Sequence, residues 1–295
     1  MIPPIKNLSP LRSWIQFKTG PLRGFPIIPG FIIFLFVFTA FFGEILAPYS
    51  ATELNLPDKF IPPFFQANGS MSHPLGTDML GRDILSRIIV GAAPSLIVAL
   101  TVVILGGVGG SALGIISGYY GGKVDVVLMR AADATLSFPI ILVAMLLAVT
   151  LGPSIRNVIL AISIIIWARY ARVVRGEVLS VRERDFVALA KVAGASGPRI
   201  MFRHIFPNVM HTILVMITLQ VGFIIVLEAT LSFLGAGIPP PTPVWGSLIA
   251  EGKMYIAGEW WISFFPGLSL ALVVLSFNML GDWLREVLDP KLRQV

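Results

Sequence analysis

The sequence predicts an all-α, polytopic membrane protein with six transmembrane helices. Hydrophobic residues make up 56% of its 295 residues and charged residues only 13%, against about 25% charged residues in ordinary soluble domains. The mean hydropathy is +0.85, and several uncharged stretches are long enough to cross a bilayer as helices. A chain this apolar could not cover its surface in water, so membrane lipid is its expected surroundings.

Five spans are read directly from uncharged stretches, because a transmembrane helix needs about 20 apolar residues. In chain order they cover Pro26–Gly43, about Ser95–Ser117, Ala134–Ser154, His204–Leu234 and Ile262–Gly281. The first has a basic flank, as a cleaved signal peptide has. No A-x-A-like cleavage site follows it, so we expect an uncleaved span.

A sixth span is expected in "NVILAISIIIWA", which has only twelve residues between Arg156 and Arg169. Its length alone suits a buried or re-entrant helix. Six spans with a cytoplasmic N-terminus place 17 Lys and Arg residues inside and 5 outside, whereas five spans would leave 7 inside and 15 outside. Because cytoplasmic loops are the positively charged ones, we predict a span whose flanking arginines snorkel at its ends.

These spans divide the chain into four parts. They are a cytoplasmic N-terminal segment (1–25), a first transmembrane helix with an external loop (26–94), a five-helix core (95–284) and a cytoplasmic tail (285–295). The core is expected to carry a cytoplasmic loop at 176–206.

Glycines recur at every fourth position of the second span, at Gly106, Gly110, Gly114 and Gly118. Residues four apart share one helix face, and bare glycine backbone lets a neighbouring helix approach closely. We therefore expect a close helix contact along this stripe, made either within this chain or with another.

The segment before this span, "HPLGTDMLGRDILSRIIVGA" (73–92), is expected to form a charged helix that enters the membrane from outside. Thr77 or Asp78 could cap it. Acidic residues precede basic ones by four positions in the pairs Asp78/Arg82 and Asp83/Arg87. Because the arginines neutralise these carboxylates, the segment is a weak candidate for a catalytic or metal site.

Glu228 is the one carboxylate deep in a predicted span, and an intramembrane acid is a functional candidate. It could serve a transport pathway, or it could hydrogen-bond a neighbouring helix or loop. The sequence has no cysteine, no G-x-x-x-x-G-K-[ST] phosphate-binding pattern and no clustered histidines. We therefore expect no catalytic residue, metal site or cofactor in this chain, and no nucleic-acid partner.

The loop stretch "FVALAKVAGASGPRIMFRHIFPN" (186–208) has the pattern of two short helices. The first is expected over 182–193, with an apolar face formed by Phe186, Leu189, Ala190 and Ala193. Gly194 can then take a left-handed conformation that ends the helix, and Pro198 suits the first turn of the second. Pro207 disfavours helix at Phe206 and can begin the next span. A bent helix pair in a basic loop is suited to lie in another protein's groove.

Part of this stretch, "AKVAGASGPRIMFRHIFPN", resembles the cytoplasmic coupling motif of binding-protein-dependent ABC importer permeases. That motif is Glu-Ala-Ala, three residues, Gly and a later Leu-Pro, and Ala190, Gly194 and Pro207 match it. Ala188 stands where the family has Glu, and Phe206 where it often has Leu. The resemblance assigns ATPase coupling to Phe186, Ala188, Leu189, Ala190, Ala193, Gly194, Ala195, Ser196, Arg199 and Pro207.

Further stretches are similar to the C-type subunit of the dipeptide/oligopeptide permease subfamily, among them "SGYYGGKVDVVLMRAADATLSFP", "LEATLSFLGAGIPPPTPVWGSLI" and "FNMLGDWLREVLDPKLR". The resemblance covers nearly the whole chain and implies a type I ABC importer permease fold in a prokaryotic inner membrane. It also implies a second permease subunit, which is expected to differ from this one, two cytoplasmic ATPases that bind ATP and Mg, and an external solute-binding protein.

The function expected from this resemblance is that of a permease subunit of an ATP-driven importer for peptides or a similar small solute. A stand-alone ion- or proton-coupled transporter that uses Glu228 is the alternative, and a membrane-embedded enzyme comes third because no catalytic set is present. Transport that requires added ATPases would favour the importer, whereas transport driven by an ion gradient alone would favour the carrier. Relatives in this subfamily carry peptides, nickel complexes, opines or sugars, so the sequence leaves the solute open.

Overall fold

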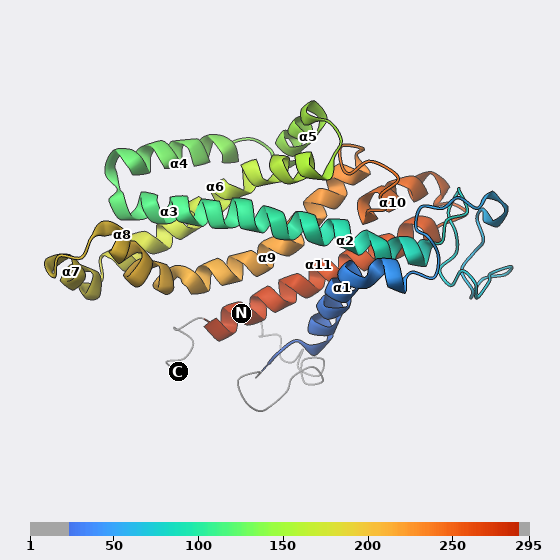
Figure 1. Cartoon of the computed structure of the whole chain (residues 1–295), viewed down its shortest axis with the longest axis horizontal. Coiled ribbons are helices and arrows are strands. Elements are labelled where there is room, and N and C mark those ends of the chain that lie inside the picture. The colour runs from blue at the N-terminus through green and yellow to red at the C-terminus, as the bar shows by residue number, and fades with distance from the viewer. Residues whose placement is uncertain (1–23, 289–295) are drawn as a thin grey trace, which may run out of the picture.

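A computed structural model describes residues 24–288, which fold as an elongated bundle of helices (Figure 1). Two short helices, α7 (Asp185–Val192) and α8 (Gly197–Ile200), lie at one end of the bundle, and α10 (Trp245–Gly252) lies at the other. We call these the α7 end and the α10 end. The described residues contain no named β-strand, so the predicted all-α class is confirmed.

Five continuous helical segments are long and apolar enough to cross a membrane. They are α1 (Ile27–Leu46), α2 to α3 (Ile84–Tyr120), α6 (Ile155–Arg182), α8 to α9 (Gly197–Phe233) and α11 (Trp261–Leu288). Two of them contain one π-helical turn, Val103–Val108 between α2 (Ile84–Val102) and α3 (Gly109–Tyr120), and Met201–Ile205 before α9 (Phe206–Phe233). The predicted multi-pass membrane architecture is therefore confirmed.

The twelve-residue apolar run that was hardest to assign lies inside α6, which has 28 residues. At 1.5 Å per residue such a helix is about 42 Å long, more than a bilayer core requires. Its first turn is capped by Ser154, whose Oγ accepts the Asn157 N–H at 3.1 Å. The charged turns that follow Arg169 continue the same helix, so Arg169 lies midway along α6 and not at the end of a span.

The third predicted span, Ala134–Ser154, is wrong as one continuous helix. The chain forms α4 (Gly122–Leu136) and α5 (Ile140–Leu151), which meet at an angle of 87°. Pro139 causes the break because it has no N–H to donate and keeps the residue before it out of the helical region. Twelve residues span only about 18 Å, so α5 cannot cross a bilayer alone, and the pair makes a sixth span only as one broken unit.

The second span starts earlier than predicted, at Ile84 and not near Ser95. Asp83 is its N-cap, since the Asp83 Oδ2 accepts the Ser86 N–H at 2.7 Å. Thr77 and Asp78, which were expected to cap this helix, lie in the loop before it.

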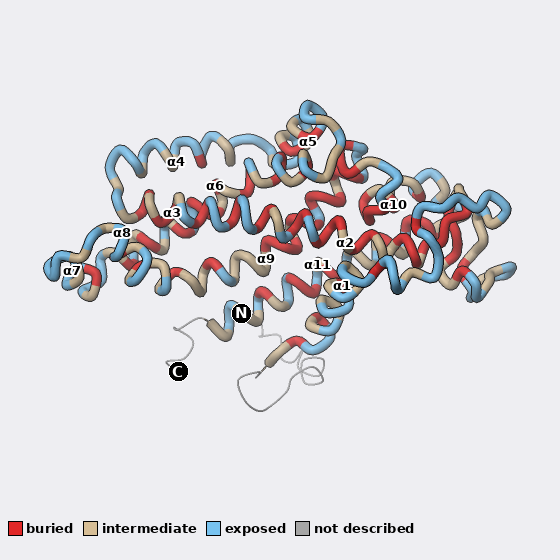
Figure 2. Tube along the Cα trace, viewed as in Figure 1, coloured by how far each residue is buried: buried red, intermediate tan, exposed pale blue. Residues whose placement is uncertain are grey.

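Buried residues concentrate along the middle of the bundle, whereas the chain around α7 is largely exposed (Figure 2). The main apolar core is built from α2, α6 and α9, and it includes Val98, Ile162, Ile165, Ile224 and Ile225. By contrast, α1 exposes Phe31, Phe34 and Phe41, as a helix that faces lipid or another subunit would. Residues 1–23 and 289–295, most of the predicted terminal segments 1–25 and 285–295, fall outside the described residues, and the domain boundaries stay predictions.

Candidate functional site

The α7 end holds the helix pair that the sequence singled out, joined by a sharp turn. The Ala195 N–H donates to the Ala190 carbonyl and the Gly194 N–H to the Lys191 carbonyl, both at 3.0 Å. These two hydrogen bonds, together with the positive φ of Gly194 (+77°), form the Schellman motif that ends many helices. The turn fixes the direction in which α8 leaves α7, so the pair is a built unit and not an irregular loop.

The inward face of α7 is centred on Val187, which is fully buried, with the half-buried Phe186 and Ala190 beside it. The four residues predicted to form one apolar face differ in burial, because Leu189 and Ala193 are exposed whereas Phe186 and Ala190 are half-buried. The outward side of the pair exposes large apolar side chains beside the charged Lys191 and Arg199: Leu189 is 68% exposed, Val192 87% and, in the turn that follows, Phe202 76%. Large apolar side chains exposed at a surface of fixed geometry are a common feature of protein contact sites.

The helix pair is packed onto the ends of the long helices. Val187 and Ile200 share one apolar cluster with Val178 and Val181 of α6 and with Ile115 of α3. Arg182, in the last turn of α6, donates to the Gly118 carbonyl oxygen of α3 at 2.9 Å. The helix pair is therefore joined to the ends of α3 and α6 through one apolar cluster.

Pro207 does not start a separate helix as predicted. Phe206 has helical dihedral angles (φ −52°, ψ −47°), and the chain passes from α8 through a π-helical turn into α9 without a break. A π-helical turn shifts the backbone hydrogen-bond register, which accommodates a proline that lacks an N–H. Of the remaining predicted coupling residues, Ala188, Ser196 and Arg199 are exposed and Ala195 is half-buried.

The four stripe glycines lie against α6 of the same chain. A Cβ placed on Gly110 would overlap the Trp167 carbonyl group, and one on Gly114 would lie 2.6 Å from the Ala171 carbonyl oxygen. Gly106 faces Ser163, and Gly118 faces Val178. Because a Cβ on Gly110 or Gly114 would collide with α6 backbone, α3 and α6 pack closely along this stripe.

Ion pairs also join α4 to α6. The Arg175 guanidinium contacts the Asp125 carboxylate at 2.5 and 2.6 Å. Asp125 also accepts from Ser117 of α3 at 2.6 Å, and Arg172 contacts Asp133. The helices α3, α4 and α6 are thus held together near the α7 end.

Glu228 is completely buried and is held by two hydroxyl groups. Ser232 donates to its Oε1 at 2.7 Å and Ser95 of α2 donates to its Oε2 at 3.2 Å. These bonds join α9 to α2. No basic side chain among the described residues pairs with Glu228, and its geometry is that of a group that holds two helices together.

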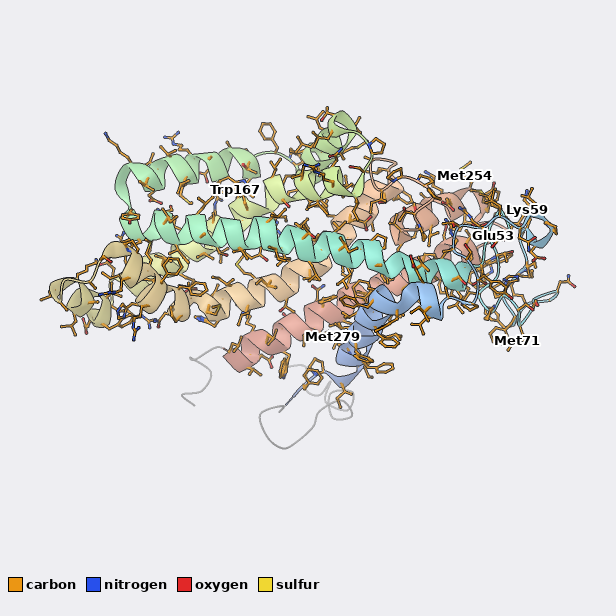
Figure 3. All side chains as sticks on the ribbon, viewed as in Figure 1. Glu53, Lys59, Met71, Trp167, Met254 and Met279 are labelled. Atoms are coloured by element: carbon orange, nitrogen blue, oxygen red, sulfur yellow. The ribbon has the colours of Figure 1, made fainter. Side chains whose placement is uncertain are left out.

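A second polar network lies at the α10 end, where Glu53, Lys59, Met71 and Met254 also gather (Figure 3). Asp78 accepts from Arg82 at 2.7 Å, as predicted, and also from Arg87 at 2.5 Å, while Glu251 of α10 contacts both arginines. The predicted Asp83/Arg87 pair is wrong, because Asp83 contacts the His73 Nδ1 at 3.0 Å and caps α2. The network ties the start of α2 to α10.

Arg169 is the polar group that sequence reasoning misplaced. Its guanidinium lies 3.4 Å from the Gln220 Oε1 and 5.0 Å from the centre of the Phe223 ring, both on α9. It lines a cavity of about 300 Å³ together with residues of α5 and α9. One feature of the sequence indicates this position. The charged turns after Arg169 could be read as a continuation of the same helix, which places Arg169 far from the helix end.

The described residues contain no group of three or more His, Cys, Asp and Glu side chains able to hold a metal ion. The arrangement has three notable parts: an exposed apolar helix pair, a closely packed α3–α6 unit behind it, and a cavity with a cation midway along the long helices.

Known proteins resemble this chain over almost its full length. Residues 110–294 match the family described as binding-protein-dependent transport system inner membrane component. The dipeptide transport system permease protein DppC of Escherichia coli (strain K12) is 41% identical over 289 residues, which is 97% of this chain and 95% of that protein. DppC of Alkalihalophilus pseudofirmus is 39% identical over 292 residues, or 99% of this chain and 94% of that protein. The di/tripeptide transport system permease protein DppC of Pseudomonas aeruginosa is 38% identical over 288 residues, or 97% and 93%.

Proposed function

The chain belongs to the family of binding-protein-dependent transport system inner membrane components, and from this premise we propose that it imports peptides. As a member of that family it is a permease subunit of an ABC importer and not an enzyme. Three of its relatives are named as permeases for dipeptides or for di- and tripeptides. Their similarity extends over nearly the whole chain and supports a short peptide as the transported solute.

The observation that carries the proposed mechanism is the outward face of α7 and α8. Leu189 and Val192 are exposed apolar groups on a turn of fixed geometry, and apolar helices that lie in a groove of a partner are a common docking mode. In this proposal a cytoplasmic ATPase receives the helix pair. The predicted coupling residues at 186–199 then transmit closure of the ATPases to the spans.

The path of that motion runs through α3 and α6. Val187 and Ile200 are buried against both helices, and the Arg182 bond to Gly118 joins their ends. Since packed helices move as rigid units, a shift of α7 tilts the α3–α6 pair. A tilt of this pair changes the opening of the bundle toward one side of the membrane or the other.

The partners follow from this mechanism. A second, different permease would supply the other half of the pathway, two ATPases would bind ATP and Mg, and an external solute-binding protein would deliver the peptide at the α10 end. In this proposal the α7 end lies in the cytoplasm together with both termini, and the basic residues Arg184, Lys191, Arg199 and Arg203 support that orientation. The parts 1–25, 26–94, 95–284 and 285–295 keep their predicted roles in this proposal.

The stand-alone carrier is not favoured. Glu228 is completely buried and accepts hydrogen bonds from two serines. A carboxylate used for coupling would need access from a water-filled path. In our proposal Glu228 joins α2 and α9 and does not lie in the pathway.

The test is reconstitution of the chain with its sister permease, ATPases and binding protein in liposomes. We expect uptake of a labelled dipeptide only when all components and ATP are present, and no hydrolysis of ATP by the purified chain alone. Uptake by the single chain with only an ion gradient would overturn the proposal. So would a complex that imports other solutes but no peptide.

A further inference from the structure

The cavity around Arg169 lies midway along the membrane-spanning helices. Arg169 is in the middle of α6, and Gln220, which it contacts, is in the middle of α9. The lining is otherwise mostly apolar and consists of Pro139, Ile140, Ile141, Phe223, Val226, Leu227 and Thr230. An intramembrane cation costs several kcal/mol to place, and it is retained where it has a partner or a task.

Arg169 differs from the arginines that follow it on α6. Each of those contacts a carboxylate: Arg172 pairs with Asp133, Arg175 with Asp125 and Arg182 with Glu183. Within residues 24–288 no carboxylate pairs with Arg169. Its contacts are one long hydrogen bond to a neutral amide and the face of an aromatic ring. Most of its five N–H donors therefore lack a strong acceptor.

The surroundings of Arg169 add further donors and no anion. Gln220 is only 6% exposed, and its Nε2 has no hydrogen-bond acceptor among the described residues. The helix α5 begins at Ile140, on the rim of the cavity, and no side chain caps its first N–H groups. The positive end of a helix dipole favours an anion nearby. Gln220 lies beside Arg169 but not on the cavity lining, so two features at the cavity itself, the Arg169 guanidinium without a carboxylate partner and the uncapped start of α5, point to a ligand that accepts hydrogen bonds and carries negative charge.

We propose that this cavity binds the terminal carboxylate of the transported peptide, with Arg169 as the group that contacts it. The inference rests on the proposed peptide-import function. A guanidinium fits a carboxylate with two parallel hydrogen bonds, and the apolar residues of α5 and α9 suit the body of a short peptide. The break at Pro139 belongs to the site, because irregular backbone at membrane depth is tolerated where it lines a cavity.

A carboxylate of the sister permease or an anionic lipid headgroup could also pair with Arg169, so the test must separate these sources. The complete permease–ATPase complex is placed in nanodiscs of phosphatidylcholine and treated with phenylglyoxal, which modifies accessible arginines. Mass spectrometry then compares modification of Arg169 with that of Arg172, which is exposed and serves as the internal reference.

Dialanine at millimolar concentration should lower modification of Arg169 several-fold, dialanine amide should not, and Arg172 should react equally in all samples. Equal effects of the acid and the amide would overturn the proposal. So would protection of Arg169 without any peptide, which would identify a carboxylate of the sister permease. Protection that appears only in phosphatidylglycerol discs would identify a lipid headgroup and would overturn it as well.

Transport by substituted complexes gives an independent measurement. Arg169→Gln should lower dipeptide uptake about tenfold or more, the effect of losing a charged hydrogen bond, while ATP hydrolysis stimulated by loaded binding protein continues. Arg169→Lys should recover part of the uptake, and Arg172→Gln should stay near the unsubstituted value. Normal uptake by Arg169→Gln would overturn the proposal. Absence of peptide uptake by the unsubstituted complex would instead overturn the peptide-import function itself.

Discussion

Arg182 of α6 donates a hydrogen bond to the Gly118 carbonyl oxygen of α3, at 2.9 Å. Gly118 is also the last glycine of the stripe that packs against α6, so the bond closes the end of a contact that is already tight. α7 begins three residues after Arg182, and its direction is set from this point. The contact between α3 and α6 therefore serves both the stability of the bundle and the position of the coupling surface.

The glycine contact predicts different outcomes for two adjacent positions. Gly110→Ala places a Cβ on the Trp167 carbonyl group, whereas a Cβ on Gly109 meets no atom within 4 Å. We expect Gly110→Ala to destabilise the chain by about 1–3 kcal/mol, the usual cost of overpacking. Gly109→Ala should be neutral or stabilising by up to about 1 kcal/mol. Thermal unfolding in detergent measures both, and equal values would contradict close packing of α3 on α6.

The polar network at the α10 end should contribute strongly to stability. Arg87 is 2% exposed, and its removal would leave Asp78 and Glu251 with Arg82 as their remaining partner in the network. Breaking a buried ion pair on one side costs about 3–5 kcal/mol, so Arg87→Ala should unfold at a markedly lower temperature. Arg172→Ala is the control, because the exposed Arg172–Asp133 pair is worth at most about 1 kcal/mol. Similar unfolding temperatures for the two variants would show that the network is dispensable.

Substitution of Glu228 tests whether its carboxylate only holds two helices together or also takes part in transport. Glu228→Gln keeps the size of the side chain and an oxygen that can accept from Ser232 or Ser95. We expect it to assemble normally and to retain ATP-driven uptake in the complete complex. A protonophore should leave that uptake unchanged. A complex that assembles with Glu228→Gln but has lost uptake would show that the carboxylate's charge is used in transport.

Substitutions of Gly194 distinguish the effect of backbone conformation on stability from the effect of a side chain on ATPase binding. Its φ is +77° and a Cβ there meets no atom of this chain within 4 Å. Asn tolerates this left-handed conformation better than other residues, so Gly194→Asn should leave thermal stability almost unchanged. Because its added side chain would lie in the ATPase groove, capture of the ATPases should fall about tenfold or more. Gly194→Arg should lose more ATPase capture, and it should also lose about 1–2 kcal/mol of stability because arginine is strained at positive φ. Normal capture and uptake with Gly194→Arg would remove the coupling assignment.

The spans could be predicted from the sequence because apolar length and charge sidedness report directly on the membrane. The bend at Pro139 could not, since the residues on both sides of it are apolar and a proline is often accommodated within a membrane helix. Its 87° angle depends on how α4 and α5 pack against α6. Arg169 was misplaced for a related reason: the charged turns after it looked like a loop, and packing against α3 and α4 makes them helix.

The structure contains the helix pair and the turn that the sequence predicted, but only part of the predicted apolar face is exposed. Gly194 and Pro198 gave the turn, since each has a specific backbone preference. The face of α7 was less certain, because Phe186, Leu189, Val192 and Ala193 are apolar on more than one side of the helix. Burial of Val187 against α6 decides which side is inward, and a tertiary contact of this kind is not encoded in local periodicity.

The exposed side of α7 provides the sharpest test of the coupling proposal. Val192 is 87% exposed, so Val192→Asp should leave the fold, the membrane insertion and the thermal stability of the isolated chain unchanged. If the outward face lies in an ATPase groove, the aspartate carries an unpaired charge into an apolar contact, which is unfavourable by several kcal/mol. Capture of the ATPases and peptide uptake should then both fall at least about tenfold.

Met254→Asp is the matched control for Val192→Asp. Met254 is 79% exposed and lies at the opposite, α10 end of the bundle (Figure 3). The Met254→Asp variant should retain ATPase capture, because the added charge is remote from the α7 surface. ATPase capture by tagged chain, measured together with dipeptide uptake, decides between the outcomes. Equal capture by both variants would mean that the ATPases bind elsewhere, since the two substitutions differ chiefly in the end of the bundle that receives the charge.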